Sequence, residues 1–156
     1  MDFRRRNFLG TGGALLALAG VAGLVRTRPA GAQQWNKAAF EARNLNDMLT
    51  VLGGAGAAES KDIHFVHPTP EVAENGDAVP IAVTSNVPQT RWIAIMVETN
   101  PTMLSASFNI PEGTEAFVSI RLKMAETSEV IALVKADGKF YYAKKAITVT
   151  QCGCGG

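Results

Sequence analysis

Two cysteines, Cys152 and Cys154, are the residues of this chain best suited to chemistry, and both lie among its last five residues. The neighbours of Cys154 are glycines, namely Gly153, Gly155 and Gly156. Glycine has no Cβ and adopts almost any backbone conformation, so nothing beside this sulfur shields it. Chain ends are poorly ordered unless they are tied down. The sequence therefore predicts that residues 151–156 form a flexible arm, about 20 Å long when fully extended, which carries a thiol into a pocket of another protein.

The same two cysteines allow a second kind of function. Thiolates are soft ligands that suit copper or zinc, although two sulfurs are fewer than the four ligands usual at structural zinc. An internal disulfide between Cys152 and Cys154 would need a sharp turn at Gly153, and it would be strained and easily reduced. The alternative to a substrate-bearing arm is therefore a thiol redox or copper-binding module.

The rest of the chain offers little further chemistry. His64 and His67 are the only histidines, and residues i and i+3 of an extended run point to opposite faces, which makes the pair a poor chelate. No Ser–His–Asp set, carboxylate pair or phosphate-binding loop stands out in the sequence. We therefore expect no catalytic residue, no metal site and no cofactor, and a protein that is not itself an enzyme.

The N-terminus has the pattern of an export signal. Arg5-Arg6-Asn7-Phe8-Leu9 resembles a twin-arginine signal, and Ala30-Gly31-Ala32 is a small-residue cleavage pattern. The uncharged residues 10–25 between them include five glycines and are fewer than the roughly 20 apolar residues of a membrane span. We expect residues 1–32 to be removed and the mature chain to work in the periplasm, an oxidising compartment, without a membrane anchor.

The charge of the mature chain excludes one class of partner. The whole chain has a formal charge of +1, but residues 1–32 contain five arginines and one aspartate. Without them, 10 basic residues (15 − 5) stand against 13 acidic residues (14 − 1), a net charge of −3. Such a domain lacks the basic surface that nucleic-acid binding requires.

One helix is expected before the strands. Within residues 35–52, four apolar residues recur at the i, i+3, i+4, i+7 spacing of a helix face, and they are Leu45, Met48, Leu49 and Leu52. This helix either packs on its own domain or binds a partner. Gly53-Gly54 would end the helix, and residues 53–58, which are mostly Gly and Ala, predict a flexible connector.

From residue 63 onward the pattern changes to short β-type runs. The predicted strands are 63–66, 79–85, 92–98, 105–110, 116–124, 129–135 and 140–150. The alternation of Val118, Ile120 and Leu122 with polar residues gives one strand a buried and a wet face. Asp137-Gly138 predicts a hairpin turn. We expect residues 33–150 to form an all-β, immunoglobulin-like β-sandwich of about seven strands, with the N-terminal helix before it and the arm after it.

Four segments together resemble the SoxY family, the sulfur-carrier subunit of the periplasmic SoxYZ complex of sulfur-oxidising bacteria. They are residues 70–76 with 79–81, Asn100-Pro101, residues 137–141, and Val149-Thr150 leading to residues 153–156. The specific part is the Cys-Gly-Gly end after a Val-Thr strand. In the family this tail usually has the sequence Gly-Gly-Cys-Gly-Gly, and here Cys152 replaces the first glycine.

The resemblance implies a mechanism and a set of partners. Cys154 would be the covalent attachment point, and Gly153, Gly155 and Gly156 its arm. A haem enzyme would join the cysteine oxidatively to thiosulfate, a hydrolase would release sulfate, and a sulfane dehydrogenase would oxidise the remaining sulfur. The resemblance also implies a constitutive heterodimer with a SoxZ-like subunit.

Two features leave alternatives open. Cys152 is either a resolving thiol that attacks a sulfane adduct on Cys154 or a substitution without a role. Lys144 and Lys145, which we expect at the root of the arm, either attract the anionic adduct or are solvated strand residues.

Overall fold

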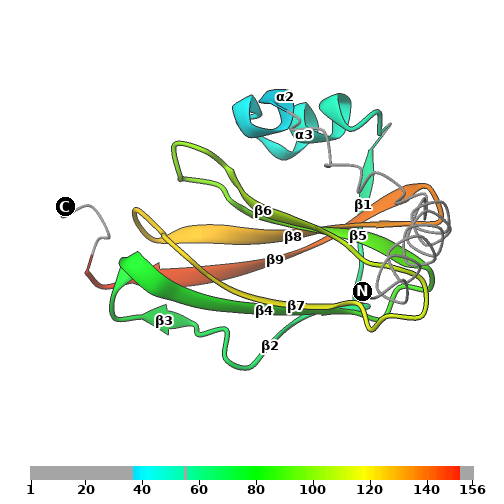
Figure 1. Ribbon diagram of the computed structural model, residues 1–156. Coiled ribbons are helices and arrows are strands. Elements are labelled where there is room, and N and C mark those ends of the chain that lie inside the picture. Colours follow the sequence, from blue (N-terminus) through cyan, green and yellow to red (C-terminus); the bar gives the residue numbers. More distant parts are fainter. Residues whose placement is uncertain (1–36, 55, 152–156) are drawn as a thin grey trace, which may run out of the picture. The chain divides into compact units, whose positions relative to one another are not determined.

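The computed structural model describes residues 37–54 and 56–151 (Figure 1). The predicted export signal (residues 1–32) and the five arm residues 152–156, which are cysteines and glycines, lie outside this range. Two α-helices begin the described part, α2 (Lys37–Glu41) and α3 (Leu45–Val51). Neither these nor any other helix of the described residues is long and apolar enough to cross a membrane.

Strands make up most of the remaining chain. They are β1 (Ala57–Glu59), β2 (Ile63–Val66), β3 (Val72–Ala73), β4 (Val79–Ser85), β5 (Thr90–Val97), β6 (Leu104–Asn109), β7 (Phe117–Leu122), β8 (Ser128–Ala136) and β9 (Lys139–Val149), with a short 3-10 helix η1 (Gly76–Ala78). All seven predicted strands are present, and each end lies within two residues of its prediction. The sequence does not predict β1 and β3, because runs of three and two residues are too short to show an alternating pattern.

The strands form two sheets. The larger sheet has the order β1-β9-β8-β5-β6, and β3 also pairs with β9. The smaller sheet has the order β2-β4-β7. Neighbouring strands are antiparallel, except that β1 and β3 both run parallel to β9 along the edge that β8 leaves open. The prediction of an immunoglobulin-like β-sandwich is confirmed.

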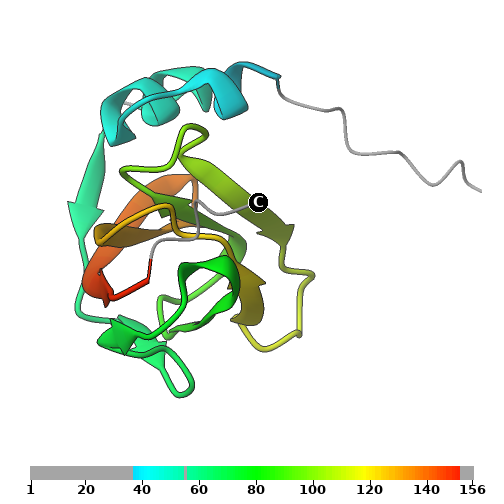
Figure 2. The ribbon, with the colours of Figure 1, turned by 90° about the vertical axis from the view of Figure 1, so that its left-hand side faces the viewer.

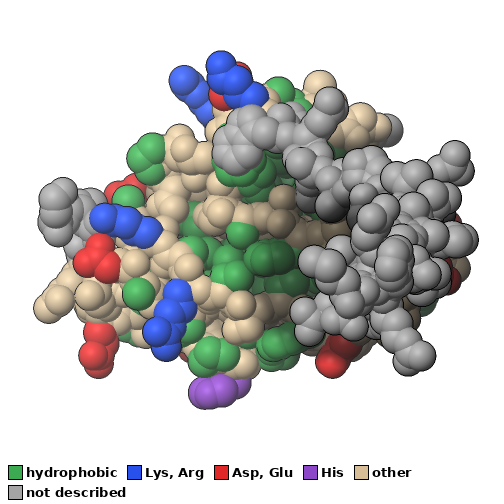
Figure 3. All heavy atoms as spheres, viewed as in Figure 1, with side chains coloured by type: hydrophobic (Ala, Val, Ile, Leu, Met, Phe, Trp, Pro, Cys, Tyr) green, Lys and Arg blue, Asp and Glu red, His purple; other side chains and the backbone are tan. Residues whose placement is uncertain are grey.

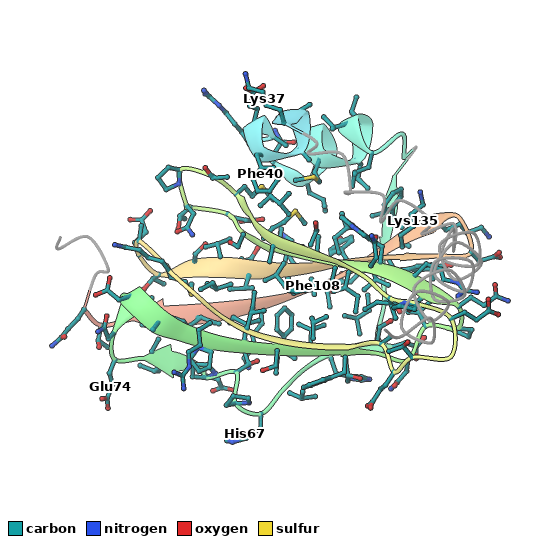
Figure 4. The ribbon with its side chains drawn as sticks, viewed as in Figure 1. Lys37, Phe40, His67, Glu74, Phe108 and Lys135 are labelled. Atoms are coloured by element: carbon teal, nitrogen blue, oxygen red, sulfur yellow. The ribbon has the colours of Figure 1, made fainter. Side chains whose placement is uncertain are left out.

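The main core lies between the two sheets. Side chains that alternate along β4, β5 and β8 point into it and are fully buried, among them Ile81, Val83, Ile93, Ile95, Val130 and Val134. The alternation in β7 also holds, since Val118 and Leu122 are buried while Ser119 and Arg121 are exposed. Phe108 of β6 lies between the sheets, half-buried (Figure 4).

A second core lies on the other face of the larger sheet, where the helices cover it (Figure 2). Met48 and Leu49 of α3 pack with Met96, Ile131 and Phe140 of the sheet. Strands β5 and β8 are therefore buried on both faces, which explains why their sequences are almost continuously apolar. The interpretation of the apolar helix stripe as a surface that packs on its own domain is the one that agrees with this core.

The single helix predicted over residues 35–52 is wrong in its continuity. The chain leaves the helix after Glu41 and begins a new one at Leu45. Asn44 causes the restart, because its side-chain oxygen accepts a hydrogen bond from Asp47 N at 2.8 Å, as an N-cap does. An asparagine inside an apolar stripe can cap a second helix as well as continue the first, so the period alone does not separate the two.

The end of α3 is a glycine motif. Gly53 has φ +71, its N–H donates to Thr50 O at 3.1 Å, and the N–H of Gly54 donates to Leu49 O at 2.8 Å. These two bonds are the Schellman pattern that closes helix C-termini. The flexible connector predicted over residues 53–58 is wrong in its second half, because Ala57 and Ala58 pair with Phe140 and Tyr141 as β1.

The turn between β8 and β9 agrees with its prediction. Asp137 and Gly138 have φ +48 and φ +73, the left-handed conformation at both central positions that a two-residue hairpin turn of type I′ needs. This turn lies at the end of the sandwich opposite to that at which β9 stops (Figure 1).

Gly54→Ala is expected to lower stability by about 1–3 kcal/mol through overpacking. A Cβ at this position would lie 2.8 Å from the Phe140 ring, which is closer than real Cβ contacts. Urea denaturation measures the loss, and Phe140→Leu in the same protein should recover part of it because a smaller side chain relieves the crowding. Strict additivity of the two changes would contradict this explanation.

Candidate functional site

The candidate site is the end of β9, from which the predicted arm starts. Antiparallel pairing with β8 ends at Ile147, which lies opposite Ser128. On the other edge, β3 continues beside β9, with Val72 opposite Thr148 and Ala73 opposite Val149. Strand β9 is thus held on both edges almost to its end. Figure 2 shows the molecule from the side on which β9 ends.

Hydrogen bonds continue beyond the strand itself. Thr150 N donates to Ala73 O at 3.0 Å, and the carbonyl of the following residue, Gln151, accepts from Gly76 N at 3.0 Å. The Thr150 hydroxyl donates to Glu74 O at 3.1 Å. Gln151 is the last described residue and directly precedes Cys152. Ordered backbone therefore reaches to the cysteine-containing residues.

The loops around this end are tied to one another. Val149 N donates to the Thr127 hydroxyl at 2.9 Å. Met124 N donates to Gly76 O at 2.7 Å, and Met124 is fully buried. The segment that holds Gln151 is consequently anchored in the main core.

Asn100 forms a further tie between loops. Its side-chain nitrogen donates to Lys123 O at 2.7 Å, and its side-chain oxygen accepts from Ala125 N at 3.0 Å. This links the β5–β6 loop to the β7–β8 loop at the same end of the sandwich. Three of the segments that carry the family resemblance, at residues 70–76, 100–101 and 149–150, thus meet in one place.

The sequence predicts Lys144 at the root of the arm, and this is wrong. Lys144 lies six residues before Thr150, roughly 20 Å along an extended strand. Its ammonium group lies 2.8 Å from a Glu129 oxygen and 2.9 Å from a Glu98 oxygen. The hydrogen bonds that it donates to Glu129 and Glu98 raise the pKa of Lys144. Two carboxylates already neutralise this lysine, which removes it as an attractor for an anionic adduct.

Lys145 points to the other face of β9 and lies 3.7 Å from an oxygen of the exposed Glu71. The nearby pair Lys123–Asp77, at 3.4 Å, is formed between two exposed side chains. Glu74 points away from the molecule at this end (Figure 4). The described surface around Gln151 therefore offers lysines that are each paired with a carboxylate.

The two histidines are both exposed and lie far from this end along β2 and the loop that follows it. His67 projects from the surface beside the smaller sheet (Figure 4). Within residues 37–54 and 56–151, no three His, Cys, Asp or Glu side chains are grouped so that they could hold a metal ion.

A cavity of about 350 Å³ lies at the opposite end of the sandwich, where β4 ends and β7 begins. Its lining includes Ser85, Thr90 and Arg91, and Arg91 pairs with Glu112 at 3.2 Å. The Ser85 and Thr90 hydroxyls lie 2.8 Å apart and bond to each other. This polar hollow is separated from the end of β9 by the length of the strands.

Sequence reasoning misses the residues that hold the last strand in place. Glu71, Ala73, Glu74 and Gly76 act mainly through backbone groups, which a sequence pattern does not display. The available signal is the segment 70–76 itself, which contributes to the family resemblance without a chemical side chain to explain it. The predicted attachment residue Cys154, the predicted resolving thiol Cys152 and the glycines Gly153, Gly155 and Gly156 lie outside the described residues.

These features define a class: a small β-sandwich domain whose last strand, held on both edges, leads into a thiol-bearing C-terminal segment. Residues 49–154 match the model of the family described as sulfur oxidation protein SoxY, which is more than half of the chain. The chain belongs to the SoxY family of sulfur oxidation proteins. Among curated proteins there is no match.

One solved structure agrees with the family. The chain is similar to the sulfur carrier protein SoxY from Chlorobium limicola f. thiosulfatophilum, with 32% identity, a TM-score of 0.60, and coverage of 67% of this chain and 94% of that chain. It is also similar to a superoxide reductase (neelaredoxin) from Ignicoccus hospitalis, with 20% identity, a TM-score of 0.49, and coverage of 59% of this chain and 82% of that chain.

Lys144→Ala is expected to lower the free energy of unfolding by about 1 kcal/mol near neutral pH, after allowance for solvent screening of a side chain that is 34% exposed. The change leaves Glu98 and Glu129 without their shared cation. Because the folded protein raises the pKa of Lys144 above its ordinary value of 10.5, the contribution stays constant below that pH and is lost as the pH rises further.

Urea denaturation in low and high salt measures this effect, and Lys145→Ala is the matched control. Lys145 has one longer contact to an exposed carboxylate, so its loss should stay within about 0.5 kcal/mol. Equal losses for both variants, or a Lys144 effect that salt does not weaken, would contradict the role of the double ion pair.

Proposed function

We propose that this protein is a covalent sulfur carrier in thiosulfate or sulfur oxidation, and that Cys154 holds the intermediate. The observation that carries the proposal is the position of Gln151, which a hydrogen bond from Gly76 holds at the end of β9. Cys154 follows three residues later, at the last position of the family match. The family and the similar sulfur carrier protein SoxY support the same role.

The anchored Gln151 also favours Cys154 over Cys152. Cys152 directly follows Gln151 and can extend only about 3.5 Å beyond it. Cys154 can extend about three times as far and has glycine on both sides. A sulfur that must enter the pocket of an enzyme needs that reach, so Cys154 is the attachment point.

Cys154 is loaded, partly hydrolysed and then freed again in the proposed scheme. Its thiolate and the outer sulfur of thiosulfate form an S–S bond and give up two electrons, which a haem enzyme accepts. A hydrolase then adds water to the terminal sulfone, so that sulfate leaves and a persulfide stays on the cysteine. A sulfane dehydrogenase takes six electrons from that remaining sulfur, with oxygen from water, and a second hydrolysis releases it as sulfate and frees the thiolate. The carrier supplies the thiolate and its presentation, and the enzymes supply the catalysis.

Cys152 has a secondary role in this scheme as a resolving thiol. Its thiolate attacks the sulfur on Cys154 that carries an adduct, and the adduct leaves with the electron pair of the broken bond, as in thiol–disulfide exchange. The resulting internal disulfide is strained and is opened again by another thiol. A Gly→Cys substitution without consequence is the alternative.

The place of action follows from the leader. Residues 1–32 combine a twin-arginine pattern with a small-residue cleavage pattern. We assign the mature protein to the periplasm, where the haem enzyme, the hydrolase and the sulfane dehydrogenase would meet it. The twin-arginine route passes folded proteins, which is compatible with a carrier that leaves the cytoplasm together with its partner.

A SoxZ-like subunit is the proposed permanent partner. Among the described residues, the outer edges of β6 and β7 pair with no other strand, and both lie on the same side of the sandwich. Half-buried Phe108 and Ile120 lie between these two edges, and Figure 3 shows hydrophobic side chains along this side. Unpaired edges beside apolar side chains invite a second β-sandwich to cover them.

Cys154→Ser is expected to abolish loading with thiosulfate, and Cys152→Ser is expected to keep most of it. Mass spectrometry of the intact protein, incubated with thiosulfate and its haem enzyme under one oxidant, compares the two variants. Retained loading in Cys154→Ser would move the site to Cys152. Copper that stays bound through purification, with no sulfur adduct, would favour the metal-binding alternative.

The protein purified from its host is expected to be a heterodimer with an apolar interface of at least about 1,200 Å², the size of stable pairs. Native mass spectrometry gives the mass of the assembly, and dilution tests its permanence. A stable monomer without a companion subunit, at the concentration at which loading occurs, would show that the unpaired β6 and β7 edges need no partner.

A further inference from the structure

The fixed part of the chain extends past β9 because one segment follows its outer edge. Thr148 N donates to Glu71 O at 2.9 Å, Thr150 N donates to Ala73 O at 3.0 Å, and Gly76 N donates to Gln151 O at 3.0 Å. The first two bonds lie two residues apart on both segments, which is the pattern of a parallel ladder. The third bond lies beyond this ladder and holds Gln151, one residue before the first cysteine.

One side chain strengthens this end of the ladder. The Thr150 hydroxyl donates to Glu74 O at 3.1 Å, from an exposed position where water would otherwise take the same proton. The residue that holds Gln151 is itself well fixed, since Gly76 is buried and its carbonyl accepts from the fully buried Met124. A rigid backbone therefore grips the chain at Thr150 and Gln151.

We propose that Thr150 and residues 73–76 form a clamp, here called the arm clamp, which fixes the origin of the arm at Gln151. Thr150 is then a positioning residue for the sulfur on Cys154. This inference rests on the proposed carrier function. With the origin fixed at Gln151, Cys154 can extend three residues, about 10–11 Å.

The arm clamp limits which enzyme sites the sulfur can reach. An enzyme whose reacting atom lies deeper than this distance below its surface cannot be served while the arm clamp is closed. The arm clamp also has an advantage in binding, because residues 150 and 151 are already ordered before the carrier meets an enzyme. Residues that become ordered only on binding lose conformational entropy, and this loss weakens the complex.

The test compares three variants of the full chain in its assembled complex. Thr150→Val keeps the β-branched shape and removes the hydroxyl, and Thr150→Ser restores it. Thr148→Val is the matched control, since Thr148 is exposed, lies two residues earlier, and its hydroxyl makes no hydrogen bond within residues 37–54 and 56–151. Two measurements are made on each: amide hydrogen exchange at Gly76, and kcat and KM for loading by the haem enzyme with thiosulfate.

For Thr150→Val we expect faster exchange at Gly76, by about three- to tenfold, because a weaker arm clamp releases Gln151 more often. We expect KM for loading to rise by a similar factor, about three- to tenfold, with kcat close to wild type. Thr150→Ser should restore both values, Thr148→Val should leave both unchanged, and the melting temperature should move little in all three.

Unchanged exchange at Gly76 in Thr150→Val would overturn the arm clamp, and so would an equal change in Thr148→Val. Faster exchange with unaltered loading kinetics would overturn the positioning role of Thr150. A wild-type complex that takes up no sulfur from thiosulfate would sink the carrier function itself. In that case the exchange comparison alone would still decide whether Thr150 closes the arm clamp.

Discussion

The structure depends on the double-sided pairing of its last strand. Strand β9 pairs with β8 on one edge from Lys139 to Ile147, and on the other edge with β1 near its start and with β3 at its end. Its side chains alternate between the two cores, with Phe140 and Tyr142 towards the helices and Ile147 and Val149 towards the smaller sheet. Because hydrogen bonds from both neighbouring edges hold the end of β9, the chain that leaves it starts from a fixed backbone.

The long strands could be predicted from the sequence because their signals are local. Alternation in β7 and the Asp137-Gly138 turn each depend on neighbouring residues only. The break at Asn44 could not, since a helical period continues through it and the capping geometry decides. The sequence around β1 predicts a Gly- and Ala-rich connector. Its pairing with Phe140 joins positions more than 80 residues apart, so no local pattern indicates a strand there.

The candidate site divides in the same way. A cysteine flanked by glycines indicates thiol chemistry directly from the sequence. The backbone groups that hold Gln151 cannot be recognised from side-chain types. The side chain of Lys144 is misleading in the sequence. Its charge suggests that it attracts anions, but in the structure it forms ion pairs with Glu98 and Glu129. A charged residue can be interpreted only when its partners are known, and those partners come from distant parts of the chain.

The position of β9 in the sheet also has a consequence for biosynthesis. It follows all the other described strands in the chain, yet it occupies an inner place between β8 and the pair β1 and β3. Contacts that join the end of a chain to its beginning form late, because the connecting loop must close first. The larger sheet therefore cannot be completed before translation has passed β9. A chain that is cut before β9 lacks the strand that joins β8 to β1 and β3, so its larger sheet stays incomplete.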